Sequence, residues 1–217
     1  EAYRNLYYTE SGQTSIWDID SEDVPGVDGR RISIESASKL WNGCGLRIGA
    51  LVTDNNTFHR KAVSEYTANL CANSIGQYIF SSITKLSTNE IRQWHQKQRD
   101  YYYSLMIQLR NQLLMNIPGI IVSNPESALY LVIDFKNIVV DDFDISIFIE
   151  YCATTGKCKL GNNLFTLLLA PMTGFYFDNN YGKTQARIAM VEPENLIEKV
   201  PLVLAQLIKD YLNLNKT

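Results

Sequence analysis

The fold is decided by residues 31–52, which read RISIESASKLWNGCGLRIGALV. Residues 31–35 alternate polar and apolar side chains in the pattern of a half-buried strand. Residues 46–52 form a mostly apolar run, which is typical of a strand that is buried on both faces. Two strands so close in the sequence frame a loop that can carry a functional site.

The loop between these strands carries groups that suit phosphate binding. Ser36 and Ser38 lie three residues and one residue before Lys39, and Arg47 follows Lys39 after seven intervening residues. Hydroxyl, ammonium and guanidinium groups donate hydrogen bonds to phosphate oxygens. The glycines of this loop allow its backbone to approach a ligand closely. Nearby positive charge and desolvation also lower the pKa of a lysine, which makes its amine nucleophilic. Lys39 is therefore a candidate Schiff-base residue.

This loop resembles the lysine motif of pyridoxal-phosphate-dependent aminotransferases of fold type I, the aspartate aminotransferase superfamily (class I/II). The resemblance continues at both ends of the chain. Glu1-Ala-Tyr3-Arg is similar to the segment that follows the aspartate facing the pyridine nitrogen of the cofactor. Gln185-Ala-Arg187-Ile-Ala is similar to the motif that binds the substrate carboxylate, and Ser127-Ala-Leu-Tyr130 to the start of a small-domain strand. The motifs occur in the order that the family has.

The resemblance implies a role for each matching residue. The pyridoxal 5'-phosphate site would consist of Tyr3, Ser36, Ser38, Lys39 and Arg47. Lys39 would form the Schiff base and move the substrate α-proton, and Tyr3 would donate to the phenolic oxygen of the cofactor. Arg187 would bind the substrate carboxylate through two parallel hydrogen bonds. Ser38 is also the kind of residue that only satisfies local backbone groups after a strand.

The implied architecture is α/β, in two parts. Residues 1–86 would be the C-terminal part of the cofactor-binding large domain, a mixed sheet with flanking helices. Residues 87–116 would form a connecting helix, and residues 117–217 a small α+β C-terminal domain.

The rest of the chain gives further expected elements. Helical periodicity covers residues 56–116, with breaks near residues 74–76 and at Ser87, where Ser87-x-x-Glu90 has the form of a capping box. The expected helix near the C-terminus should be kinked by Pro201. The remaining expected elements are strands at 128–134, 164–170 and 186–191 and helices at 144–155 and 193–213.

We expect the chain to correspond to the C-terminal half of such an enzyme, because members of the family are much longer. It begins at Glu1 with neither an initiator methionine nor a leader, as if entered midway. The residue before Glu1 is expected to be the aspartate that keeps the pyridine nitrogen of the cofactor protonated. The 217 residues alone are not expected to be a competent enzyme.

Composition excludes several other classes of protein. The formal net charge is -3 with no basic block, so no nucleic-acid partner is expected. No apolar run approaches the roughly 18 residues of a membrane span. With two histidines in the whole sequence, no metal site is expected. The cysteines lack a Cys-x-x-Cys pair and are expected to be reduced thiols of a cytoplasmic protein: Cys44, Cys71, Cys152 and Cys158.

The leading hypothesis is transamination between an α-amino acid and a 2-oxo acid by a homodimer with active sites at the subunit interface. One alternative is a pyridoxal-phosphate-dependent lyase or decarboxylase on the same scaffold. Another is a non-catalytic, aminotransferase-like ligand-sensing domain of a regulator. Residues 67–74 contain no arginine where dicarboxylate-specific relatives carry one, so a preference for aspartate is not supported.

Overall fold

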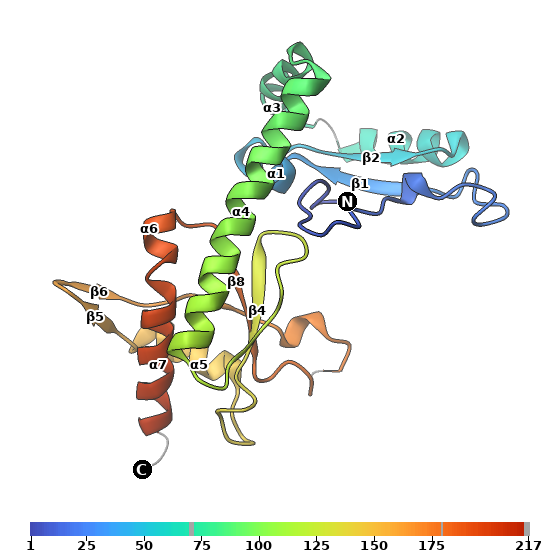
Figure 1. The fold of residues 1–217 in the computed structure, drawn as a ribbon. Helices are drawn as coiled ribbons and strands as arrows, with labels where there is room; N and C mark the ends of the chain where they lie inside the picture. Colours follow the sequence, from blue (N-terminus) through green and yellow to red (C-terminus); the bar gives the residue numbers. More distant parts are fainter. Residues whose placement is uncertain (70–71, 179, 215–217) are drawn as a thin grey trace. The chain divides into compact units, whose positions relative to one another are not determined.

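The computed structural model describes residues 1–69, 72–178 and 180–214 (Figure 1). The chain divides into two compact units, Glu1–Arg99 and Asp100–Thr217. The division falls inside the long helix α4 (Thr88–Asn116), and each unit is described by itself.

The first unit is organised around an antiparallel hairpin. Ser33 pairs with Val52 and Ser36 with Gly49, so the loop between the strands closes directly beyond Ser36. Helices follow the hairpin along the chain. The elements of this unit are η1 (Ile16–Asp18), β1 (Ile32–Ser36), α1 (Ala37–Leu40), η2 (Cys44–Leu46), β2 (Gly49–Thr53), α2 (Asn56–Asn69), α3 (Ser74–Ser81), η3 (Ser82–Lys85) and the start of α4.

The second strand differs from its expectation in length and in burial. It begins only at Gly49, because η2 occupies residues 44–46 and Arg47 adopts a left-handed conformation with φ 55°. Leu51 and Val52 are 44% and 41% exposed, so the expected burial on both faces is wrong. The physical reason is that β1 and β2 form a two-stranded sheet in the described chain, and such a sheet has no second layer of its own.

The helical character of the segment that ends at Asn116 is confirmed, including its start signal at Ser87. The break expected near residues 74–76 is misplaced, because these residues form the first turn of α3, for which Asn73 is the N-cap. The Ser87 hydroxyl accepts from the backbone N–H of Glu90 at 3.2 Å, and the Glu90 carboxylate accepts from the backbone N–H of Ser87 at 2.8 Å. This reciprocal pair is a capping box, and it satisfies two backbone donors that a helix start otherwise leaves unpaired.

The second unit contains a four-stranded antiparallel sheet in the order β3-β4-β8-β7. A separate small hairpin, β5-β6, lies outside this sheet. The elements are β3 (Ile121–Val122), β4 (Tyr130–Asp134), α5 (Ile145–Thr154), β5 (Cys158–Leu160), β6 (Asn163–Phe165), β7 (Ala170–Pro171), η4 (Thr173–Phe175), β8 (Gln185–Ala189), α6 (Glu194–Ile197) and α7 (Val200–Leu214).

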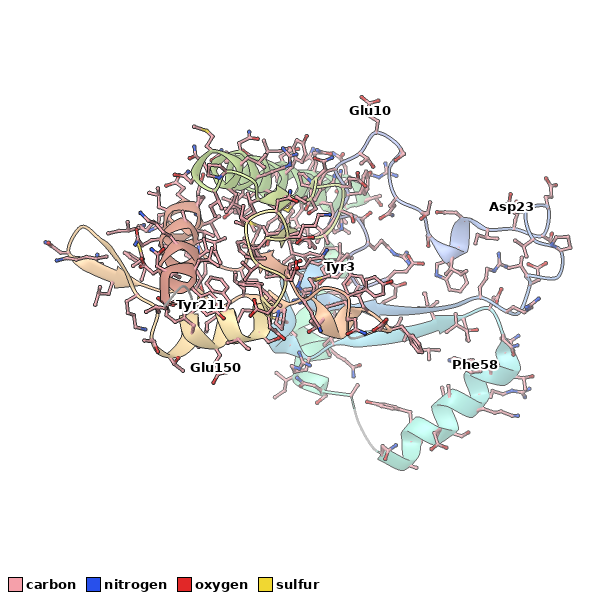
Figure 2. All side chains as sticks on the ribbon, turned by 90° about the horizontal axis from the view of Figure 1, so that it is seen from below. Tyr3, Glu10, Asp23, Phe58, Glu150 and Tyr211 are labelled. Carbon is pink, nitrogen blue, oxygen red and sulfur yellow. The ribbon has the colours of Figure 1, made fainter. Side chains whose placement is uncertain are left out.

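The two central strands have one buried and one half-buried face. Leu131 and Ile133 of β4 and Ile188 of β8 are buried, whereas Tyr130 and Arg187 point to the opposite, half-buried face. Aromatic rings join α5 to α7 on the core side, where Tyr211 is labelled in Figure 2. The largest fully buried side chains of this unit are Phe135, Phe148, Met106, Leu113, Leu131, Ile133, Ile145, Leu204, Leu207, Val203 and Pro201. The half-buried face is thus the one available to a ligand.

The single strand expected at residues 164–170 is wrong. The run is divided between β6, which turns back onto β5, and β7, which pairs with β8. The Thr166 hydroxyl donates to the carbonyl of Cys152 at 2.5 Å, and Leu168 is 77% exposed. Two different pairing partners therefore divide a run that hydrophobicity alone presents as one strand.

The helix expected at 193–213 is interrupted rather than kinked. α6 ends at Ile197 and α7 begins at Val200, which places Pro201 in the first turn of α7. A proline lacks the N–H that a continuous helix would require at this position, and its ring clashes with the carbonyl four residues earlier. In a first turn neither problem arises, so a break before Pro201 costs less than a strained kink.

Candidate active site

The lysine of the loop lies on a one-turn helix that starts where β1 ends. Ser36 caps this helix, and its hydroxyl accepts from the backbone N–H of Ser38 at 3.1 Å. The backbone N–H of Ala37 donates to the carbonyl of Ile48 at 3.0 Å, which ties the helix to the returning chain. Lys39 is half-buried in this turn. Its backbone is therefore fixed from both sides by the hairpin.

The returning segment closes tightly over the same turn. The N–H of Gly43 donates to the carbonyl of Ala37 at 3.0 Å, and the guanidinium of Arg47 donates to the carbonyl of Cys44 at 3.0 Å. A Cβ on Gly43 would lie 3.2 Å from the Ala37 carbonyl, and one on Gly49 would lie 2.9 Å from the carbonyl oxygen of Glu35. Glycine at these positions is what lets the loop pack onto the strand end, while the Arg47 side chain stays exposed.

Tyr3 belongs to the same unit, in the segment before the hairpin (Figure 2). The next residue, Arg4, forms ion pairs with Glu35 of β1 at 2.6 Å and with Glu1 at 2.7 Å. These pairs hold the N-terminal segment against the strand that leads into the lysine loop. Tyr3 is half-buried there.

A hydrogen-bond chain around Glu35 was not foreseen from the sequence. The Glu35 carboxylate accepts from Arg4 and, at 2.8 Å, from the hydroxyl of Ser33, which itself accepts from the indole N–H of Trp17 at 3.0 Å. The pairing with Arg4 neutralises a carboxylate that lies directly next to Ser36, so the charges of Lys39 and Arg47 are left to attract an anion. The sequence feature that could have indicated this chain is the carboxylate of Glu35, at the end of an otherwise alternating strand.

A cleft of 980 Å³ lies in the first unit and is lined partly by Trp41, two residues after the lysine. Trp41 stacks on Trp94, with ring centroids 5.2 Å apart, and its centroid is 4.8 Å from the ring of His95. Burial, together with the neighbouring Arg99, lowers the pKa of His95. The His95 imidazole packs against the rings of Trp41 and Trp94 in this aromatic cluster.

Arg187 lies in the second unit, on the half-buried face of β8. Its guanidinium carbon is 4.8 Å from the ring centroid of Tyr130 and 4.8 Å from that of Phe175. Arg187 also lines a cleft of 610 Å³ whose other walls are largely apolar, and Glu192 and Lys199 are the other charged residues in its lining. The structure thus groups Tyr3, Ser36, Ser38, Lys39 and Arg47 in the first unit and holds Arg187 in the second.

The strand that carries Arg187 is anchored by a buried carboxylate, Asp134. Asp134 accepts from the hydroxyl of Thr184 at 2.6 Å, from the amide of Gln185 at 2.9 Å and from the backbone N–H of Lys136 at 2.9 Å. Burial by itself raises the pKa of Asp134, but these hydrogen bonds favour the charged form and hold the pKa below its ordinary value. The carboxylate thereby links the end of β4 to the start of β8, the strand that carries Arg187.

Asp134→Asn is expected to lower the free energy of unfolding by about 1–3 kcal/mol at pH 7, because asparagine cannot accept all three hydrogen bonds. The folded-state pKa of Asp134 lies below the unfolded value of about 3.9. The contribution is therefore complete above pH ~4 and disappears as the pH falls through the folded-state pKa. Urea unfolding of both proteins at neutral and acidic pH measures the difference.

The control for this experiment is Asp142→Asn, at an exposed aspartate of the same unit, which should change stability by less than about 0.5 kcal/mol. A difference between Asp134→Asn and the parent that stays constant down to acidic pH would contradict the proposed role of the ionised carboxylate.

The structure also describes the metal-binding side chains, the cysteines and the apolar character of the helices. In the described part of the chain, no group of three or more metal-binding side chains is found. Cys44, Cys152 and Cys158 are free thiols, while Cys71 lies outside the described residues. Burial raises the pKa of Cys152 to about 11, so this thiol is unreactive. Among the described helices, none combines the length and apolar character needed to cross a bilayer.

Comparisons with known proteins place the chain in a family. The sequence profile named Aminotransferase class I and II matches residues 1–196. No curated protein matches the chain.

Several solved structures share the fold. A kynurenine aminotransferase from Pyrococcus horikoshii, in complex with PMP, is 21% identical over 97% of this chain and 47% of its own, with a TM-score of 0.72. An α-aminoadipate aminotransferase from Thermus thermophilus is 17% identical over 99% and 50%, with a TM-score of 0.74.

A PLP-bound putative aminotransferase from Clostridium difficile is 16% identical, covers 95% of this chain and 48% of its own, and has a TM-score of 0.75. The chain therefore spans about half the length of these solved structures. The expected α/β fold, a portion of a large domain followed by a small α+β domain, is confirmed by this likeness and by the strand and helix order. With the family profile covering residues 1–196, the chain belongs to the class I and II aminotransferase family.

Proposed function

We propose that the chain supplies the lysine-bearing half of the active site of an aminotransferase that transfers an amino group between an α-amino acid and a 2-oxo acid. The observation that carries this proposal is the loop of residues 36–49. It presents Lys39 on a one-turn helix, ties that helix to the returning strand at Ile48, and lies within the family match.

The residues of the loop fit pyridoxal phosphate. Ser36 and Ser38 have hydroxyl groups, Arg47 has an exposed guanidinium, and the carboxylate next to them, Glu35, is already paired with Arg4. A set of donors with net positive charge is what a phosphate dianion requires. The hydrogen bond from Gly43 to the Ala37 carbonyl and the pairing of Gly49 with Ser36 keep these donors on one short, closed loop. Two of the solved structures with this fold were obtained with PLP or PMP bound.

When bound, pyridoxal phosphate supplies an electron sink that acidifies the hydrogen on the α-carbon of an amino acid. Lys39 would hold the cofactor through a covalent bond from Nζ. Its amine, once released, would take the proton from the α-carbon and return it during transfer. Arg47, Ser36 and Ser38 would hold the phosphate during this exchange, and the phenol of Tyr3 would donate to the phenolic oxygen.

Arg187 would orient the amino acid. A guanidinium binds a carboxylate through two parallel hydrogen bonds, which fixes the direction of the α-carbon–hydrogen bond relative to the base. The backbone of Arg187 is positioned by β8, which lies inside the sheet between β4 and β7. The hydrogen bonds of Asp134 to Thr184 and Gln185 hold the start of this strand.

We further propose that the working protein is a cytoplasmic homodimer with active sites at the subunit interface. The remaining contacts to the cofactor would come from the part of the solved structures that this chain does not cover, about half of their length. On this basis residues 1–217 alone are not expected to be a competent enzyme.

A half-reaction tests the proposal. The complete protein, loaded with pyridoxal phosphate, is given single α-amino acids without any 2-oxo acid. The expected result is one equivalent of 2-oxo acid per site and conversion of the bound cofactor to pyridoxamine phosphate, because the amino group stays on the enzyme.

Two other results would contradict transamination. Release of carbon dioxide or of a side-chain fragment, with the cofactor in its aldehyde form, would identify a decarboxylase or lyase. Amino-acid binding without any product would identify a ligand-sensing domain.

A further inference from the structure

The guanidinium of Arg187 is held between two aromatic rings that come from the segments on either side of its own strand. Tyr130 is the first residue of β4, and Phe175 ends η4, the short helix that comes after β7 in the chain. Both ring centroids lie 4.8 Å from the guanidinium carbon. Because β8 lies between β4 and β7 in the sheet, the sheet order itself brings the two rings to the cation.

The guanidinium carbon lies over the face of each ring, at a distance typical of a cation–π contact. Cations are attracted to the faces of aromatic rings, whereas carboxylates bind the N–H groups at the edge of the guanidinium plane. Within residues 1–69, 72–178 and 180–214, no carboxylate forms an ion pair with Arg187. The two rings therefore restrict a long, flexible side chain while its charge is left for an anionic ligand.

The position of the Phe175 ring is not explained by packing into the core. It is 58% exposed, although exposure of a phenyl ring to water is unfavourable. Its contact with Arg187 gives this ring a specific partner in spite of its exposure.

We propose that Tyr130 and Phe175 are positioning residues, which hold the Arg187 guanidinium in the orientation that binds the α-carboxylate of the substrate. The inference rests on the proposed function of Arg187. Tyr130 acts through its ring, so Tyr130→Phe retains the effect, while Phe175 can be truncated at the surface with little loss of packing.

The main test is Phe175→Ala in the complete protein with its cofactor. KM for the amino acid should rise roughly three- to tenfold, because a restrained guanidinium becomes free to rotate, while kcat changes by less than about twofold. Phe175→Tyr should restore the parent KM. The matched control is Phe177→Ala, two residues further on at a fully exposed ring, which should leave KM and kcat unchanged.

A binding measurement separates carboxylate recognition from catalysis. Isothermal titration calorimetry should show that Phe175→Ala raises the dissociation constant for 3-phenylpropionate by the same three- to tenfold factor as KM. Its uncharged counterpart, 3-phenylpropionamide, should bind the two proteins equally. Equal weakening of both ligands, or a lowered melting temperature with kcat and KM both impaired, would overturn the inference in favour of a structural role.

Arg187→Gln distinguishes failure of this inference from failure of the proposed function. If Arg187→Gln leaves KM and 3-phenylpropionate binding unchanged, the proposed role of Arg187 is wrong, and the positioning inference fails with it. If Arg187→Gln raises KM but Phe175→Ala does not, only the positioning inference is wrong. The inference is supported if Phe175→Ala raises KM in the parent and has no effect when combined with Arg187→Gln.

Discussion

Lys39→Ala in the complete protein is expected to lower kcat by roughly four orders of magnitude, while pyridoxal phosphate still binds without a covalent bond. The amine of Lys39 is the proposed base for the substrate α-carbon, and alanine has no group that can take the proton. Arg47, Ser36 and Ser38 remain to bind the phosphate, because their loop is held by backbone and side-chain hydrogen bonds that do not involve the lysine side chain. Steady-state rates and the cofactor content after gel filtration measure the two effects.

Borohydride reduction of the parent protein identifies the bonded lysine directly. Mass spectrometry of a digest should find the reduced cofactor adduct on Lys39 and on no other residue. The control is Lys61→Ala, at an exposed lysine of α2, which should keep both the adduct and the rate. An adduct on another lysine, or full activity of Lys39→Ala, would remove Lys39 from the site.

The lysine loop could be predicted from the sequence because its structure is determined over a short range. Ser36 caps the helix that carries Ser38 and Lys39, and the return at Gly49 pairs with Ser36 itself. Most groups that fix this turn lie within the stretch that first indicated the site, although the amide of Asn73, outside that stretch, also donates to the carbonyl of Leu46 at 3.0 Å. The capping box at Ser87 was predictable for the same reason.

Features that depend on distant partners could not be predicted in this way. The pairing of Arg4 with Glu35 and the two rings around Arg187 join residues that are far apart in the sequence. The expected strand at residues 164–170 is wrong for a related reason. Hydrophobicity identifies a buried run, but the choice between β5 and β8 as partner is made by the rest of the sheet.

The exposure of β2 shows a different limit. Its apolar side chains indicate burial, and Leu51 and Val52 are nevertheless more than 40% exposed. An apolar pattern indicates that a strand is stable when other elements cover it. A two-stranded sheet without a further layer is only marginally stable. The apolar pattern of residues 46–52 is therefore matched by burial only in part within the described residues.

The role of Arg187 is tested most sharply by the substitution that keeps its charge. Arg187→Lys is expected to raise KM for the amino acid and to lower kcat/KM by roughly 100-fold, which corresponds to about 3 kcal/mol. Lysine retains the positive charge but has no planar pair of N–H groups for a carboxylate, and it lacks the guanidinium that lies over the rings of Tyr130 and Phe175. Steady-state kinetics with an α-amino acid and a 2-oxo acid measure the change.

Cofactor affinity should be unaffected by Arg187→Lys, because the proposed phosphate ligands and Lys39 belong to the other unit of the chain. Arg60→Lys, at an exposed arginine of α2, makes the same chemical change at a residue that is not proposed for either site and should leave both KM and cofactor affinity unchanged. An unchanged KM in Arg187→Lys, combined with weaker cofactor binding, would place Arg187 outside the substrate site. The motif around it would then act only through packing: Arg187 would fix the two aromatic rings of the sheet, and the substrate carboxylate would need another cation.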